Sequence, residues 1–145
     1  MRIGTLCACR QRVGRIGSIL VVDDERVTRE MVVELLRGEG LDARSAGSVD
    51  EALEALRQGS FGAILSDIQM PAKNGFTLLS ELREIGCSIP VILMTSFGTE
   101  ETAQEAIAAG AFDCLLKPFG RSALLEMVHR ALQARAALED PVAGA

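Results

Sequence analysis

Four short apolar stretches of the sequence run directly into side chains that could do chemistry. The residues that follow them are Asp23 and Asp24 after 19–22, Asp67 after 63–66, Thr95 after 91–94, and Lys117 after 112–116. Short apolar runs bounded by polar residues and proline indicate buried strands. If these strands are parallel neighbours, their polar ends open onto one edge of a sheet, where open α/β sheets bind ligands. We therefore expect carboxylates, a hydroxyl and an amine to converge there.

The segments that must position these groups alternate between strand and helix. Apolar residues recur at helical spacing in 25–37, 49–58, 76–85, 99–109 and 121–138. Glycines follow the first four segments, where helices should stop. Ser48 and Glu51 have the spacing of a capping box, and Asn74-Gly75 suggests a turn. With a further strand at 41–46, the alternation predicts an α/β fold, a flavodoxin-like (βα)5 doubly wound parallel sheet of strand order 2-1-3-4-5.

Composition and charge favour a folded protein outside the membrane. The chain has 145 residues, of which 48% are hydrophobic and 24% charged, as in an ordinary single domain. Its net charge of −5 argues against a nucleic-acid surface, because proteins that neutralise phosphates carry a basic face. No run approaches the roughly 18 apolar residues that cross a bilayer, and the first residues are too short for a secretory signal. We expect a cytoplasmic protein without direct contact to nucleic acid or membrane.

The pattern divides the chain into three parts. Residues 1–17 have four arginines, three glycines and no strand or helix period, so we expect a disordered N-terminal extension. A partner-binding or membrane-surface arm is the alternative for this segment. Residues 18–138 form the expected domain, and 139–145 a C-terminal tail that is either a natural end or the start of a linker.

The four cysteines indicate no disulfide framework. Cys87 falls near an expected helix end and Cys114 inside an expected strand, and cytosolic thiols stay reduced. Cys7 and Cys9 could ligate a metal, but no second pair with ligand spacing follows. We expect Cys114 to pack as a small hydrophobe, and the single histidine, His129, to lie on a helix surface.

Four motifs in register identify a family resemblance. They are Val21–Glu25, Ser66–Pro71, Met94–Ser96 and Leu116–Phe119. In this order and spacing, over residues 18–138, they resemble the receiver domains of bacterial two-component response regulators, which have a CheY-like fold. Gly110–Asp113 looks most like receivers of the nitrogen-regulator (NtrC-like) branch.

The resemblance implies an acidic phosphorylation site. Asp67 would be the phosphoacceptor. Asp24, Asp67 and the backbone carbonyl of Gln69 would hold Mg²⁺, with Asp23 acting through water. The residue types agree, because clustered carboxylates repel one another unless a cation lies among them, and Mg²⁺ prefers oxygen ligands.

The resemblance also implies a switch. Thr95 would hydrogen-bond the phosphoryl oxygen and Lys117 would pair with it. The donor would be a histidine kinase or a phosphotransfer protein. The acyl phosphate would then alter the face of the fourth helix, fifth strand and fifth helix, which would bind a downstream protein of unknown identity or a second copy of the chain. Such a protein is no enzyme beyond self-phosphorylation and slow self-dephosphorylation.

Two positions depart from the family pattern. Cys114 stands where many receivers carry Tyr or Phe, which puts the usual coupling to Thr95 in doubt. Phe97 stands where many receivers carry a smaller or polar residue. With Gln69 it would flank the phosphoryl group, so we expect Phe97 to restrict the attacking water and slow dephosphorylation.

Alternatives remain beside this interpretation. The chain could be a receiver-like interaction domain that works without phosphorylation, or a receiver cut from a longer transcriptional regulator. Asp23-Asp24 could be a simple turn before a helix, and Lys117-Pro118 a solvated loop. A phosphohydrolase of the haloacid-dehalogenase type is disfavoured, because Gln69 stands where those enzymes carry a proton-donating acid.

Overall fold

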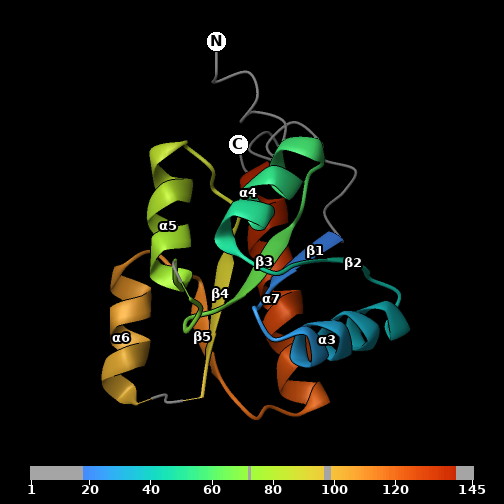
Figure 1. Cartoon of the computed structure of the whole chain (residues 1–145). Helices are drawn as coiled ribbons and strands as arrows, with labels where there is room; N and C mark the ends of the chain where they lie inside the picture. Colours follow the sequence, from blue (N-terminus) through green and yellow to red (C-terminus); the bar gives the residue numbers. More distant parts are fainter. Residues whose placement is uncertain (1–17, 72, 97–98, 140–145) are drawn as a thin grey trace.

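A five-stranded parallel sheet organises the protein (Figure 1). The computed structural model describes residues 18–71, 73–96 and 99–139. The strands are β1 (Ser18–Val22), β2 (Asp42–Ala46), β3 (Ala63–Asp67), β4 (Val91–Thr95) and β5 (Asp113–Leu116). The helices are α3 (Arg26–Gly38), α4 (Val49–Gln58), α5 (Gly75–Glu84), α6 (Glu100–Ala108) and α7 (Arg121–Glu139). The predicted alternation of strand and helix is confirmed.

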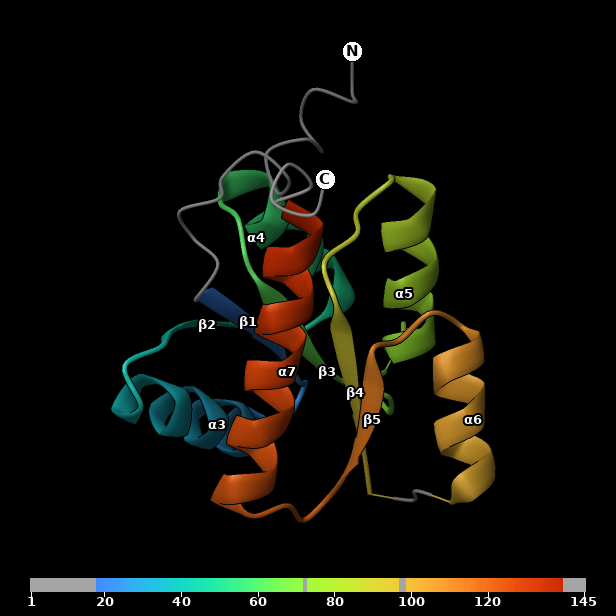
Figure 2. The ribbon, with the colours of Figure 1, turned by 180° about the vertical axis from the view of Figure 1, so that it is seen from behind.

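The strands lie in the order β2-β1-β3-β4-β5, as predicted, and every neighbouring pair is parallel. Helices α4, α5 and α6 cover one face of the sheet, and α3 and α7 cover the other (Figures 1 and 2). The helix after β1 lies on one face and the helix after β2 on the other, and β3 returns to the opposite side of β1. The ends of β1 and β3 therefore lie side by side at the switch point of the sheet. Among the described residues, no helix is long and apolar enough to cross a membrane.

Two apolar cores hold the sheet between its helices. Every residue of β1, β3 and β4 is buried, because these central strands are covered on both faces. Alternate residues serve different cores: Leu20 and Ile64 pack toward α4, α5 and α6, whereas Val21 and Leu65 pack toward α3 and α7. Burying a side chain of this kind contributes about 1.5–3 kcal/mol.

Polar caps fix where three helices begin. Ser48 accepts a hydrogen bond from the Glu51 N–H at 3.1 Å, as the predicted capping box requires. The return bond differs, because the Glu51 carboxylate accepts from the N–H of Gly47 at 2.8 Å. Asn74 and Thr99 cap α5 and α6 in the same way as Ser48 caps α4.

The structure corrects two details near the candidate site. Asn74 and Gly75 form the N-cap and the first residue of α5, so the dipeptide starts a helix instead of making a free turn. β5 begins at Asp113, one residue later than expected. Phe97, Cys7 and Cys9 lie outside the described residues.

Candidate functional site

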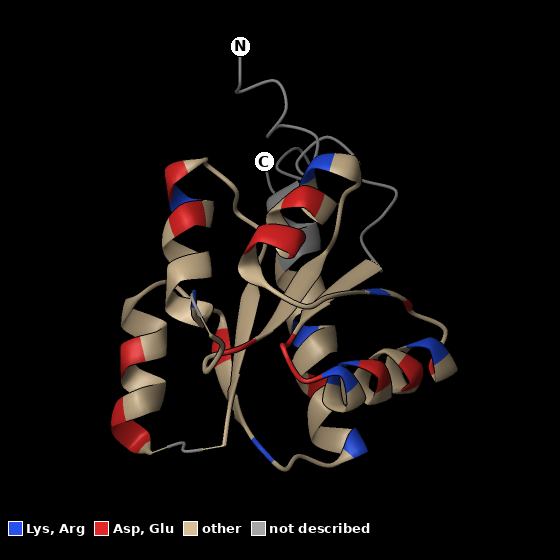
Figure 3. Ribbon diagram, in the orientation of Figure 1, with Lys and Arg blue, Asp and Glu red and all other residues tan. Residues whose placement is uncertain are grey.

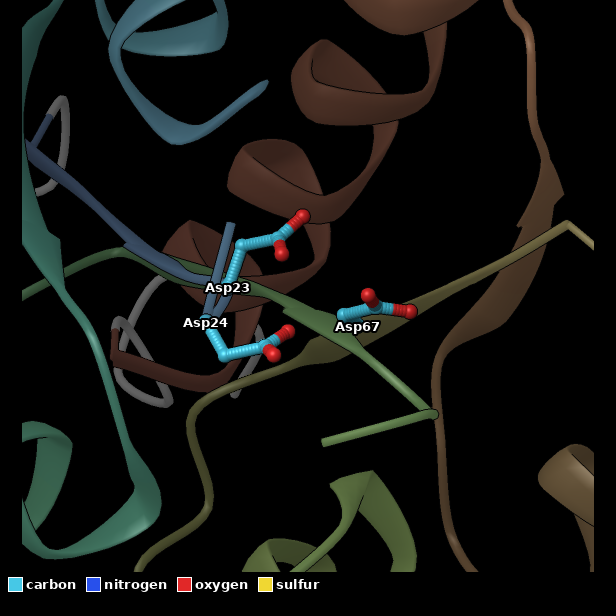
Figure 4. A group of neighbouring side chains, drawn as sticks. All are labelled: Asp23, Asp24 and Asp67. Atoms are coloured by element: carbon cyan, nitrogen blue, oxygen red, sulfur yellow. The ribbon is translucent and has the colours of Figure 1, made fainter. Parts of the chain in front are cut away.

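Three carboxylates meet where β1 and β3 end. Val22 pairs with Ser66 in the parallel register, so Asp23 and Asp24 emerge beside Asp67. One carboxylate oxygen from each of these aspartates lies within 4.8 Å of the others. Figure 4 shows the three side chains reaching toward a shared space, and Figure 3 shows acidic colour at the ends of the same two strands. The predicted convergence of the aspartates is therefore present.

Lys117 lies between two of these acids. Its Nζ is 3.0 Å from Oδ2 of Asp23 and 3.3 Å from Oδ2 of Asp67. The side chains of Asp23, Asp67 and Lys117 are 0%, 10% and 16% exposed, so water screens these pairs only weakly. The lysine comes from the segment after β5 and closes the site from the far side of β4. Lys117 is thus no solvated loop residue.

Burial and charge shift two pKa values in this cluster. Burial raises the pKa of Asp67 above its ordinary value, and the neighbouring Asp23 adds to the rise, although Lys117 opposes it. Burial alone would lower the pKa of Lys117, but the hydrogen bond to Asp23 and the attraction of both acids raise it overall. Lys117 is therefore held in its charged form between Asp23 and Asp67, and ionising the Asp67 carboxyl group is costly.

The loop that carries Asp23 is held on several sides. The backbone N–H of Asp23 donates to the Ala46 carbonyl at 3.1 Å, and the Asp23 carbonyl accepts from Arg29 Nη1 at 2.8 Å. Its carboxylate also accepts from the Glu25 N–H at 2.9 Å. Asp23 thus turns the chain just before α3, and its other carboxylate oxygen pairs with Lys117. Arg29 was not predicted from the sequence, because its contact depends on how α3 packs against this loop.

The strand end that carries Asp67 is equally constrained. Ile68 donates its N–H to the Met94 carbonyl at 2.8 Å, and Gly75 donates to the Ile68 carbonyl at 3.0 Å. The Gln69 N–H donates to Oδ1 of Asp67 at 3.3 Å, which leaves Oδ2 facing Lys117. Asp67 itself is the last residue of β3, where we had expected it to open into a loop.

A family model for the response regulator receiver domain matches residues 19–129. This chain belongs to that family. Receivers of this family are generally phosphoacceptors without an enzymatic turnover of their own. The prediction made from the four motifs is confirmed at the level of the family.

The chain is also similar to longer regulatory proteins. The chain is 39% identical over 114 residues to the transcriptional regulatory protein ZraR of Salmonella typhimurium, covering 79% of this chain and 26% of that protein. It is 39% identical over 118 residues to the regulatory protein AtoC of Escherichia coli, covering 81% of this chain and 26% of that protein. The chain thus spans about a quarter of the length of these relatives.

Solved receiver structures resemble the whole domain. The receiver domain of NtrX from Brucella abortus has a TM-score of 0.75 and 36% identity, with 79% of this chain and 98% of that chain covered. A receiver domain from Francisella, response regulator 1452, has a TM-score of 0.77 and 27% identity, with 81% and 98% covered. The NtrX match agrees with the expected likeness to the NtrC-like branch.

The receiver site has a donor set that suits Mg²⁺. Receivers bind Mg²⁺ in an acidic pocket, and three hard carboxylate ligands are grouped here. Asp24 is exposed, which leaves one side of the cluster open to solvent.

Thr95 and Cys114 lie on two neighbouring strands, β4 and β5. Thr95 is the last residue of β4 and is fully buried, and its carbonyl accepts from the Lys117 N–H at 2.7 Å. Cys114 lies opposite Leu93 on β5 and is half-buried against the core under α4, α5 and α6. The expected packing of Cys114 is confirmed, and His129 is exposed as predicted.

Proposed function

We propose that Asp67 accepts a phosphoryl group, in a Mg²⁺-dependent reaction, from a histidine kinase or phosphotransfer protein of the cytoplasm. The observation that carries this proposal is the Lys117 ammonium placed between Asp23 and Asp67, beside a third carboxylate from Asp24. An acidic pocket with one buried cation fits a reaction in which negative charge is delivered to a carboxylate. We take residues 18–138 as the domain that does this.

The reaction follows from the charges in the site. An oxygen of the Asp67 carboxylate forms a bond to phosphorus while the bond from phosphorus to the donor's atom breaks, and the donor keeps that electron pair. A Mg²⁺ ion bound by Asp24, Asp67 and the Gln69 carbonyl, with Asp23 acting through water, would neutralise charge on the transferring oxygens. Lys117 supplies a further positive charge beside Asp67. The protein's part is to orient the acceptor and to balance charge.

The acyl phosphate carries about two negative charges in place of the single charge of the Asp67 carboxylate, and these charges need partners in the site. We assign these roles to the Thr95 hydroxyl and the Lys117 ammonium. A bond between the Lys117 N–H and the Thr95 carbonyl ties their backbones together, so a shift of one moves the other. Their strands lead to the α6, β5 and α7 face, where Ile107 and Leu116 are 49% and 53% exposed. This face is our candidate surface for a downstream protein or a homodimer.

The lifetime of the acyl phosphate depends on which groups flank it. We propose that Gln69, which is exposed next to Asp67, and Phe97 modulate dephosphorylation by limiting access of water. A Phe97→Ala variant should lose its phosphoryl group faster than the unaltered chain. An unchanged half-life would remove Phe97 from this role.

The test is phosphorylation by acetyl phosphate with Mg²⁺, followed by intact-mass and Phos-tag measurements. Asp67→Asn and an EDTA-treated sample run beside it, and Asp50→Asn serves as an exposed aspartate outside the cluster. A single added phosphoryl group that needs both Asp67 and Mg²⁺ supports the proposal. A folded protein that takes up no phosphoryl group would favour a receiver-like interaction domain that works without phosphorylation. The small thiol of Cys114 at the switch position is the observation that favours this alternative.

A further inference from the structure

Helix α5 begins against the backbone of the proposed phosphoacceptor. Its first residue, Gly75, is buried. A Cβ atom placed on Gly75 would lie 2.8 Å from the carbonyl oxygen of Asp67, 3.1 Å from the Cα of Ile68 and 2.9 Å from Cδ2 of Leu93. Real Cβ atoms do not approach other atoms as closely as the two shorter distances, and they rarely reach the third, so any side chain here would force the neighbours to move.

The two backbone neighbours have little freedom to yield. The Asp67 carbonyl accepts a hydrogen bond from the buried Ser66 hydroxyl at 3.1 Å. Ile68 is fixed on both sides, because its N–H, in the same peptide as the Asp67 carbonyl, donates to the Met94 carbonyl, and its own carbonyl accepts from the Gly75 N–H. Leu93 can change rotamer, so it is the softer of the contacts. A larger residue at 75 would therefore press on the peptide between Asp67 and Ile68.

Glycine is a poor choice for a helix start unless close approach requires it, because it loses more backbone freedom on folding than alanine does. A Cβ on Gly110 would also be crowded, but by the guanidinium end of the Arg83 side chain, whereas at Gly75 two of the three neighbours are backbone atoms. A Cβ on Gly38, Gly59 or Gly120 would meet nothing within 4 Å. Gly38 is also helical, at the last position of α3, so it offers a matched comparison.

We infer that Gly75 is a positioning residue for the acceptor site. Its missing side chain lets α5 seat directly on the Asp67 carbonyl, with the Ser66 hydroxyl holding that carbonyl from within β3. Together they set the direction of the Asp67 carboxylate and of the backbone that reaches the Gln69 carbonyl, two of the groups proposed to hold Mg²⁺. The inference deepens the proposed function and rests on it for its purpose, but its geometry is independent of phosphorylation.

The test measures Mg²⁺ binding by NMR titration of the unphosphorylated full chain, alongside urea unfolding. Gly75→Ala should weaken Mg²⁺ binding about 10- to 100-fold, the range seen when groups that orient metal ligands are altered. Gly38→Ala should leave the Mg²⁺ affinity unchanged. An affinity of Gly75→Ala equal to that of the unaltered chain would overturn the inference.

A double variant separates positioning from simple crowding of the core. Gly75→Ala with Leu93→Val removes the Cδ2 contact but keeps the contact with the Asp67 carbonyl. We expect the Mg²⁺ affinity to stay as low as in Gly75→Ala, because the contact with the Asp67 carbonyl is kept. Full recovery of Mg²⁺ affinity would mean that Gly75 serves only core packing, and would overturn the assignment.

A third variant covers the case in which Gly75→Ala does not fold. Ser66→Ala adds no atoms and removes only the hydroxyl that holds the Asp67 carbonyl, so it should weaken Mg²⁺ binding several-fold. Unchanged binding in Ser66→Ala, with Gly75→Ala unfolded, would count against the inference. Failure of the unaltered chain to take up phosphate, with Mg²⁺ affinity still dependent on Gly75, would reject the proposed function and leave the positioning role standing.

Discussion

The acceptor end of the sheet and its output edge are built differently. Around Asp67, backbone hydrogen bonds, the partly buried Lys117 and the close approach of Gly75 leave little room for movement. Along β5, the side chain at the switch position is the half-buried thiol of Cys114, and Leu116 is 53% exposed. The difference suggests that taking up a phosphoryl group and passing the change outward are separable properties of this chain. Each experiment below perturbs one region and asks whether the other responds.

The largest effect is expected from removing the positive charge of Lys117. Lys117→Met should lower the rate of phosphorylation of Asp67 by about 10²–10³-fold, as loss of a group that stabilises transition-state charge commonly does. The measurement is the rate of Phos-tag shift with acetyl phosphate. Lys73→Met is the control, because Lys73 pairs with Asp50 and Glu81 on the surface and is 41% exposed. Equal phosphorylation rates for both variants would show that phosphorylation of Asp67 does not require the positive charge of Lys117.

Mg²⁺ should stabilise the acceptor end by occupying ligands that only the folded chain brings together. The free energy of unfolding should rise by about 2.7 kcal/mol when Mg²⁺ is at about 100 times its Kd. Thermal unfolding with and without EDTA measures this. Asp24→Asn should shrink the stabilisation, whereas the exposed Asp50→Asn should not. A stabilisation that survives Asp24→Asn would place the ion elsewhere.

A smaller effect is expected at the output edge. Cys114→Tyr should leave the phosphorylation rate unchanged, because Cys114 pairs with Leu93, two residues before Thr95. It should enlarge the NMR shift changes at Leu116 that follow phosphorylation, since a large ring fills space that a thiol leaves. Cys87→Ala is the control for altering a half-buried thiol. Unaltered shift changes in Cys114→Tyr would mean that residue 114 does not limit the response.

The smallest effect concerns the thiol itself. Burial raises the pKa of Cys114, and the charge of Asp113 adds to the rise. A raised pKa leaves less thiolate at a given pH, so alkylation at pH 8 should be slower than for free cysteine and should accelerate as the pH increases. Cys7, Cys9 and Cys87 would be changed to serine so that Cys114 alone reports. A rate at or above that of free cysteine would contradict the half-buried placement.

Strand order and the polar strand ends could be predicted from the sequence because both follow local rules. An apolar run of strand length places its last polar residue at the sheet edge, which sufficed for Asp67 and Thr95. Gly75 and Arg29 could not be found in this way. The role of Gly75 depends on the distance between α5 and β3, and that of Arg29 on the seating of α3 beside the Asp23 loop. Asn74-Gly75 carried a visible signal, but as a dipeptide it is equally typical of a turn.

The contacts of Lys117 with Asp23 and Asp67 also determine when the site forms during folding. Lys117 is 94 residues from Asp23 and 50 from Asp67 along the chain. Contacts of such long sequence separation form late in folding, because the chain loses the entropy of closing the loop before the contact can stabilise it. During synthesis the three aspartates would be made first and Lys117 last. A nascent chain that has not yet docked β5 therefore holds repelling carboxylates and no counter-charge, so competence for phosphoryl transfer is itself a report that the domain is complete.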